Sequence, residues 1–189
     1  MAIMDGDAFW AVVEDARAGV DDTRTAEGAE EVAERIENRL TELGPESAVA
    51  FALHYDVLGA RSYDGNLWGA AYLMKGGCSD DAFDYFRGWL VTQGRRTWER
   101  ALQDPDTLAE LGVDPDDDFL ECEDMLGVGR RAFGEEEAFY RALDAARGKL
   151  PAETFERPAA ADDFDHDDDG EMRARYPRLA EIYLERAPE

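Results

Sequence analysis

The chain has 189 residues, of which 44% are hydrophobic and 11% aromatic, a composition typical of one globular domain that folds without disulfides or metal. Asp and Glu number 45 against 20 Lys and Arg, giving a formal net charge of −25 at pH 7. Nucleic acids and anionic membranes bind proteins through clustered basic residues, so we expect neither as a partner.

Hydrophobic residues recur at helical spacing along the chain, and nowhere do β-branched residues alternate as they do in a strand. The pattern predicts an all-α, single-domain, irregular bundle of about seven to nine helices. Asp7 is predicted to cap the first helix and Gly19 to end it, and Thr25 caps the second. Gly44 ends the second helix, and Pro45 opens the third because proline suits a first turn.

The fourth segment, from Leu67 to Met74, is apolar on every side. A helix without a polar face is buried all round, so we expect the other helices to pack around this central one. Gly76 and Gly77 follow it, and one of them is expected to adopt the left-handed conformation that ends many helices.

Ser79 is predicted to cap a fifth helix from Asp80 to Thr92, which ends at Gly94. Aspartates in its first turn favour this start, because the helix dipole attracts anions there. The expected elements that follow are a short helix at 95–102, a turn at 106–111 and helices at 118–133 and 135–147.

After Gly148 the composition changes to prolines, alanines and an acidic run at 162–169, followed by a last helix at about 178–185. We therefore expect residues 1–150 to form the helical domain. Residues 151–189 should form an acidic linker and a C-terminal helix.

Asp165, Asp167 and Asp169, followed by Gly170, repeat the first half of a calcium-binding loop. That loop ends in a bidentate acid, whereas Tyr176 stands at the corresponding position here. The three aspartates therefore form either a weak site for a divalent cation or part of a solvated linker. No other cofactor is indicated.

The most distinctive segment is residues 76–90, GGCSDDAFDYFRGWL. Together with the pair Phe9–Trp10 and the run LWGAAY at 67–72, it resembles domain-of-unknown-function family 4240, an uncharacterised bacterial family. The resemblance covers roughly residues 7–133, implies a mostly helical fold and implies no activity. The residues that we interpret as its structural hallmark are Trp68, Gly76, Gly77, Cys78, Phe83, Phe86 and Trp89.

On the fifth helix, Asp80, Asp84 and Arg87 share one flank beside the predicted core face. We take these three, with Ser79 and Tyr85, as a candidate binding site. Three interpretations stay open: a capped and ion-paired helix with no ligand, a ligand or partner site, or a divalent metal held by Asp80, Asp84 and another carboxylate.

Cys78 precedes a helix N-terminus, a position that can lower a thiol pKa and so favour a nucleophile. The chain offers only His54 and His166 as a base for it. His54 lies beside an apolar helix face and His166 lies in the acidic run, so a Cys–His pair is not favoured. No Walker A, GxGxxG, HExxH or GxSxG motif occurs.

The start of the chain lacks the basic and apolar regions of a signal peptide, and the two cysteines form no CxxC motif. We therefore expect a cytoplasmic protein with reduced thiols. The acidic surface is either simply solvated or docks a basic partner. We predict a non-catalytic binding or interaction module whose partner is a protein. The alternative is a metal-assisted hydrolase that uses Asp80, Asp84 and Arg87.

Overall fold

The computed structural model describes residues 4–116, 119–158 and 164–184. These residues form ten α-helices, slightly more than the predicted seven to nine, and three short 3₁₀-helices. None of the described residues lies in a strand, which confirms the all-α prediction. The α-helices are α1 (Gly6–Arg17), α2 (Ala26–Leu43), α3 (Pro45–Arg61), α4 (Gly65–Lys75), α5 (Asp80–Thr92), α6 (Arg95–Gln103), α7 (Val128–Phe133), α8 (Glu136–Arg147), α9 (Asp169–Arg175) and α10 (Pro177–Tyr183). The 3₁₀-helices are η1 (Pro105–Leu111), η2 (Glu123–Leu126) and η3 (Ala152–Phe155).

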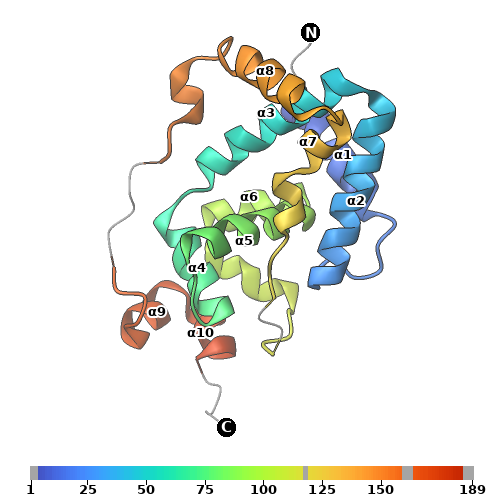
Figure 1. Ribbon diagram of the computed structural model, residues 1–189. Helices are drawn as coiled ribbons and strands as arrows, with labels where there is room; N and C mark the ends of the chain where they lie inside the picture. The colour runs from blue at the N-terminus through green and yellow to red at the C-terminus, as the bar shows by residue number, and fades with distance from the viewer. Residues whose placement is uncertain (1–3, 117–118, 159–163, 185–189) are drawn as a thin grey trace.

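The helices form three neighbouring groups (Figure 1). Helices α1, α2, α3, α7 and α8 lie together at one end, α5 and α6 lie in the middle, and α4, α9 and α10 lie at the other end. One hydrophobic core runs through all three groups, and a smaller cluster joins α3 to α8. No helix in the described ranges is both long and apolar enough to cross a membrane.

Helix α5 has the predicted limits and supplies the largest buried rings. Ser79 Oγ accepts a hydrogen bond from the Ala82 amide at 3.3 Å, and Phe83, Phe86 and Trp89 are fully buried. At Gly88 a Cβ atom would lie 2.4 Å from the Cys122 carbonyl oxygen. Glycine at this position therefore lets the segment before η2 pass directly over α5.

Helix α4 is buried along most of its surface, as predicted, but it lies at one end of the bundle against α5, η1 and α10 rather than at its centre. Leu67 and Met74 are buried, whereas Trp68 and Tyr72 are half-buried. The Trp68 ring stacks on Phe83 with 4.5 Å between centroids, and its Nε1 donates to the Cys78 carbonyl at 3.2 Å. These contacts tie α4 to the start of α5. Between the two helices, Gly76 adopts the predicted left-handed conformation, with φ 66°.

Two predicted boundaries are wrong. The first helix begins earlier, since Asp5 rather than Asp7 caps it by accepting from the Ala8 amide at 2.8 Å. The predicted helix at 118–133 is much shorter, because residues 119–122 are not helical and α7 begins only at Val128. Leu120 and Cys122 are buried on either side of a partly exposed residue, an alternation that suits an extended chain crossing α5. The start of that predicted helix, at 118, lies outside the described residues.

The predicted acidic linker contains a helix that sequence reasoning missed. Asp168 caps α9 by accepting from the Gly170 amide at 2.8 Å, so an acidic residue starts a helix there. The last helix begins at Pro177, close to the prediction, and its predicted end at 185 lies outside the described residues. Tyr176 and Leu179 are buried in the main core, and the Tyr176 hydroxyl donates to the Asn66 carbonyl at 2.8 Å.

Candidate functional site

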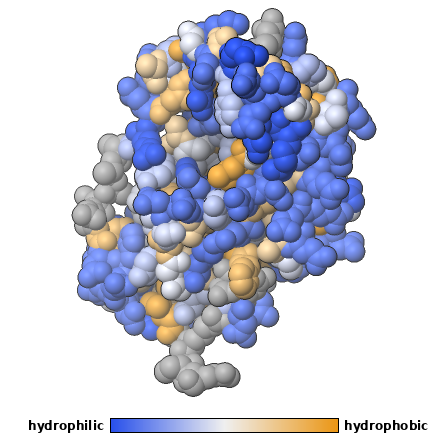
Figure 2. Space-filling view, viewed as in Figure 1, coloured by the Kyte–Doolittle hydropathy of each residue, from blue (hydrophilic) through white to orange (hydrophobic). Residues whose placement is uncertain are grey.

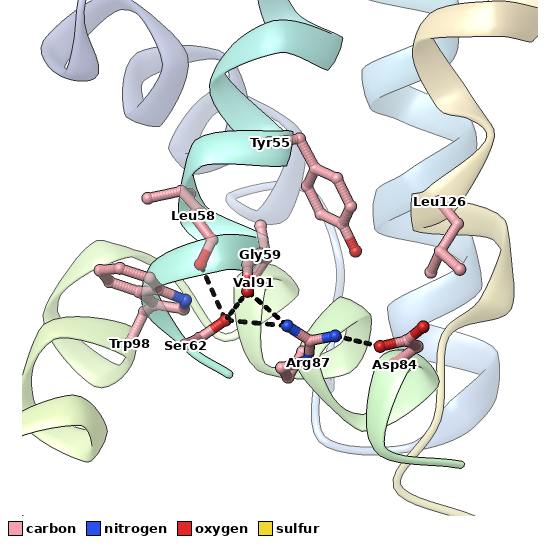
Figure 3. Close-up of a pocket in the computed structure, with 9 residues that line it drawn as sticks. All are labelled: Tyr55, Leu58, Gly59, Ser62, Asp84, Arg87, Val91, Trp98 and Leu126. Atoms are coloured by element: carbon pink, nitrogen blue, oxygen red, sulfur yellow. Dashed lines mark hydrogen bonds and ion pairs between the residues drawn. The ribbon is translucent and has the colours of Figure 1, made fainter. Parts of the chain in front are cut away.

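Two adjoining hollows lie beside the C-terminal half of α3. The smaller one, the Arg87 pocket, has a volume of about 110 Å³. The larger one, the outer cleft, has a volume of about 510 Å³ and reaches the segment that follows α8. The Arg87 pocket is lined by Tyr55, Leu58, Gly59, Ser62, Asp84, Arg87, Val91, Trp98 and Leu126 (Figure 3). The outer cleft is lined by Tyr55, Asp56, Gly59, Ala60, Tyr63, Asp84, Arg87, Arg147, Phe155 and Arg157.

Arg87 forms the wall between the two hollows, and its side chain is only 12% exposed. Its Nη1 donates to the Gly59 carbonyl at 2.5 Å and to Ser62 Oγ at 3.5 Å, while Nη2 donates to Asp84 (Figure 3). The guanidinium carbon also lies 5.1 Å from the centroid of the Tyr63 ring. Arg87 thus ties α5 to the last turn of α3, where a cation is favoured by the helix dipole.

The Arg87 pocket contains donors that face no acceptor. Arg87 Nε and Trp98 Nε1 are both buried without a hydrogen-bond partner among the described residues. Trp98 is only 6% exposed, and its indole nitrogen faces the side of the pocket where Ser62 lies (Figure 3). Leaving a buried donor unpaired costs about 1–3 kcal/mol, so an acceptor that came within hydrogen-bond distance of either nitrogen would recover that energy.

The hydroxyl of Tyr55 is a third donor in this pocket. It points toward the pair formed by Arg87 and Asp84 (Figure 3), and within the part of the chain that the structure describes it makes no hydrogen bond. Burial raises the pKa of the Tyr55 phenol, an effect that the charge of Arg87 opposes. The phenol therefore stays protonated at neutral pH and can donate a hydrogen bond to a ligand.

The outer cleft is richer in cations than the rest of the chain. Arg147 donates to Asp56 Oδ2 from Nε at 3.1 Å and from Nη2 at 2.7 Å. Burial raises the pKa of Asp56, an effect that Arg147 opposes. The guanidinium carbon of Arg157 lies 3.5 Å from the centroid of the Tyr63 ring, and no described carboxylate pairs with Arg157. With Arg87 and Asp84, the lining holds three arginines against two aspartates, a local charge of 3 − 2 = +1.

The candidate residues from the sequence are distributed around these hollows. Asp84 and Arg87 line both of them, whereas Ser79 serves as the cap of α5. Asp80 accepts from the Tyr63 hydroxyl at 3.2 Å, which places it at the edge of the outer cleft without lining it. Tyr85 lines neither hollow, and its pKa is raised mainly by the charge of Glu123, with further acidic neighbours.

Among the lining residues that sequence analysis did not place in the candidate site are Tyr55, Trp98, Arg147 and Arg157. Tyr55 belongs to an apolar helical stripe, where a tyrosine reads as core. Trp98 and the two arginines carry no spacing signal: Trp98 belongs to α6, the helix after α5, and the two arginines belong to the end of α8 and the segment beyond it.

Cys78 lacks the environment of a nucleophile. Its side chain is half-buried, and burial raises the pKa of its thiol to about 11, the opposite of the change that activation requires. His54 packs its ring on Phe9 with 4.8 Å between centroids, and burial lowers its pKa. Both residues therefore act as packing groups.

The aspartates of the C-terminal segment have separate partners. Asp165 Oδ1 accepts from the Asp167 amide at 2.9 Å, and Asp167 Oδ1 accepts from the Tyr72 hydroxyl at 2.5 Å. Asp169 is the first residue of α9. Within the described residues, no group of three or more His, Cys, Asp or Glu side chains is placed to hold a metal ion, here or beside Asp84.

Comparison with known proteins places the larger part of the chain in one family. The family model described as "Protein of unknown function (DUF4240)" matches residues 4–135. No curated protein and no solved structure matches the chain. The matched range contains every residue of the Arg87 pocket, whereas Arg147, Phe155 and Arg157 of the outer cleft lie beyond it.

Proposed function

Since the chain belongs to this family, and the family range contains the whole Arg87 pocket, we propose that it is a non-catalytic binding protein that takes a small ligand in that pocket. One observation carries the proposal: Trp98 Nε1 and Arg87 Nε are buried at the pocket without an acceptor in the described residues. Proteins rarely leave such donors unpaired, and a bound group that supplies an acceptor is the explanation that we propose here.

The lining favours a ligand with an oxygen acceptor on a small apolar body. Tyr55, Trp98 and Arg87 offer donors, while Leu58 and Val91 offer apolar contact. Arg87 already pairs with Asp84, so the pocket itself has little net charge. A carbonyl or carboxyl group suits both the donors and the size of the pocket.

The side chains of the pocket favour binding over catalysis. Tyr55 is held in its protonated form and so cannot act as a base at neutral pH. Asp84 pairs with Arg87, and Asp80 accepts from Tyr63, so the two carboxylates of the alternative hydrolase site are engaged separately. A binding module needs no more than the donors and apolar walls that the pocket supplies.

The experiment follows the indole N–H of Trp98 by ¹H–¹⁵N NMR, with Trp98→Phe used to assign it. We expect titration with succinamide and with succinate to move this signal saturably, since each presents carbonyl or carboxyl oxygens to the pocket. Leu126→Phe should weaken both effects by filling the pocket. Leu43→Phe is the matched control, because Leu43 is 43% exposed and Leu126 45%, yet Leu43 lies outside both hollows. The proposal would be contradicted if neither compound shifted the Trp98 signal, or if Leu126→Phe responded as strongly as the wild type.

A further inference from the structure

We propose that the outer cleft is an anion subsite, in which Arg147 and Arg157 bind a carboxylate or phosphate group of the same ligand whose other end enters the Arg87 pocket. This inference rests on the proposed binding function. It adds the chemical class of the ligand: a small organic anion with a second, acceptor-bearing end.

The balance of charge in the cleft is the first argument. The whole chain carries −25, and most of its arginines pair with nearby carboxylates. In the cleft, Asp84 pairs with Arg87 and Asp56 pairs with Arg147. The charge of Arg157 then remains uncompensated by any described carboxylate. An arginine that lines a cleft in this state attracts an anion.

The contact of Arg157 with Tyr63 is the second argument. Its guanidinium carbon lies 3.5 Å from the centroid of the Tyr63 ring, a cation–π contact that uses none of its N–H groups as hydrogen-bond donors to an oxygen. Those N–H groups make no hydrogen bond among the described residues, and their fork matches the two oxygens of a carboxylate or phosphate. Arg147 adds a further donor, because only its Nε and Nη2 bind Asp56.

The continuity of the two hollows is the third argument. They share Tyr55, Gly59, Asp84 and Arg87, so one molecule can reach from the buried donors to the cationic cleft. The outer cleft, at about 510 Å³, lies in the size range of small-molecule sites. The family range thus supplies the acceptor pocket, and the segment from Arg147 to Arg157 supplies the anion subsite.

The test compares two probes of the same shape. Succinate and succinamide both present carbonyl-type oxygens, but only succinate carries the charge that the arginines would bind. We expect succinate to bind the wild type about tenfold more tightly than succinamide, measured by the Trp98 signal and by calorimetry. Arg157→Gln should remove this preference and leave succinamide binding unchanged.

Arg141→Gln is the matched control, since it also removes one exposed arginine of the C-terminal half and lies outside both hollows. Inorganic phosphate serves as a third probe. If phosphate binds Arg157→Gln more weakly than Arg141→Gln, the result supports the anion subsite independently of the Arg87 pocket. The inference would be overturned if succinate bound the wild type and Arg157→Gln equally well and if phosphate bound Arg157→Gln as tightly as Arg141→Gln. In that case the proposed function would still be supported if the Trp98 signal responded to both succinate and succinamide and if Leu126→Phe removed this response.

Discussion

Replacement of Arg87 by methionine tests whether this side chain holds α5 against α3. Methionine keeps the unbranched shape and the apolar contacts of the stem, but removes the charge and every donor. The wild-type group bonds the Gly59 carbonyl at 2.5 Å, pairs with Asp84 and lies 4.9 Å from the centroid of Phe83. The substitution therefore removes polar contacts between two helices with little change in packing volume.

The expected cost follows from these contacts. A hydrogen bond from a charged donor to a part-buried carbonyl contributes about 1.5–3 kcal/mol. The pair with Asp84 adds less than about 1 kcal/mol, because the Asp84 side chain is 44% exposed. Part of this loss is offset, because methionine avoids the free-energy cost of burying a charged guanidinium, whose side chain is only 12% exposed in the wild type. We expect a net loss of about 2–3 kcal/mol in the free energy of unfolding.

Urea unfolding followed by far-UV circular dichroism measures this loss, and the melting temperature should fall by roughly 2–4 °C per kcal/mol for a chain of this size. Asp84→Asn is the companion variant and should cost less than about 1 kcal/mol, as it removes only the exposed half of the network. If Asp84→Asn proves as damaging as Arg87→Met, the pair rather than the carbonyl contact stabilises the junction. A loss below about 1 kcal/mol for Arg87→Met would refute the role of Arg87 altogether.

Three further outcomes follow from the structure. Glu110 pairs with Arg100 and a second arginine, and these hydrogen bonds lower its pKa from 4.5 to about 2. Its contribution to stability is therefore present above about pH 4.5 and is lost as the pH falls toward 2. Glu110→Gln should flatten this part of the acid-unfolding curve. Tyr176→Phe removes the hydroxyl that bonds the Asn66 carbonyl, and should lower the free energy of unfolding in urea by about 1 kcal/mol. Because burial raises the pKa of Cys78 from 9.0 to about 11, its reaction with a disulfide reagent at pH 8 should be roughly 100-fold slower than in the unfolded chain.

The helices that the sequence predicts well are those whose start, core face and end are signalled together. In α5, Ser79 caps the start, Phe83 and Phe86 mark the core face, and Gly94 follows the end, so every local preference agrees. The helix at 118–133 had only a proline turn before it and a glycine after it. Its first part is extended: Leu120 and Cys122 are buried, and the Cys122 amide donates to the Tyr85 carbonyl of α5, a tertiary contact that local periodicity does not report.

The candidate site was predictable only where one helix supplies it. Asp84 and Arg87 share a flank of α5, and helical spacing alone places them together. Their partners in the two hollows come from α3, α6, η2, the end of α8 and the segment after it. Whether Trp98 finds an acceptor for its N–H depends on the positions of these elements in space, and no sequence pattern encodes that.

The acidic surface and the proposed anion subsite have compatible roles. Hydrophilic residues cover most of the face drawn in Figure 2, and the chain as a whole repels anions. An anion therefore binds only where direct hydrogen bonds from arginine outweigh this repulsion. Dissolved salt screens the distant carboxylates more than a contact inside a cleft, because the screening length at physiological ionic strength is about 8 Å. A cationic cleft in an acidic protein is therefore selective. An anion that cannot reach both Arg157 and the buried donors of the Arg87 pocket should bind only weakly, because its few hydrogen bonds do not outweigh the repulsion.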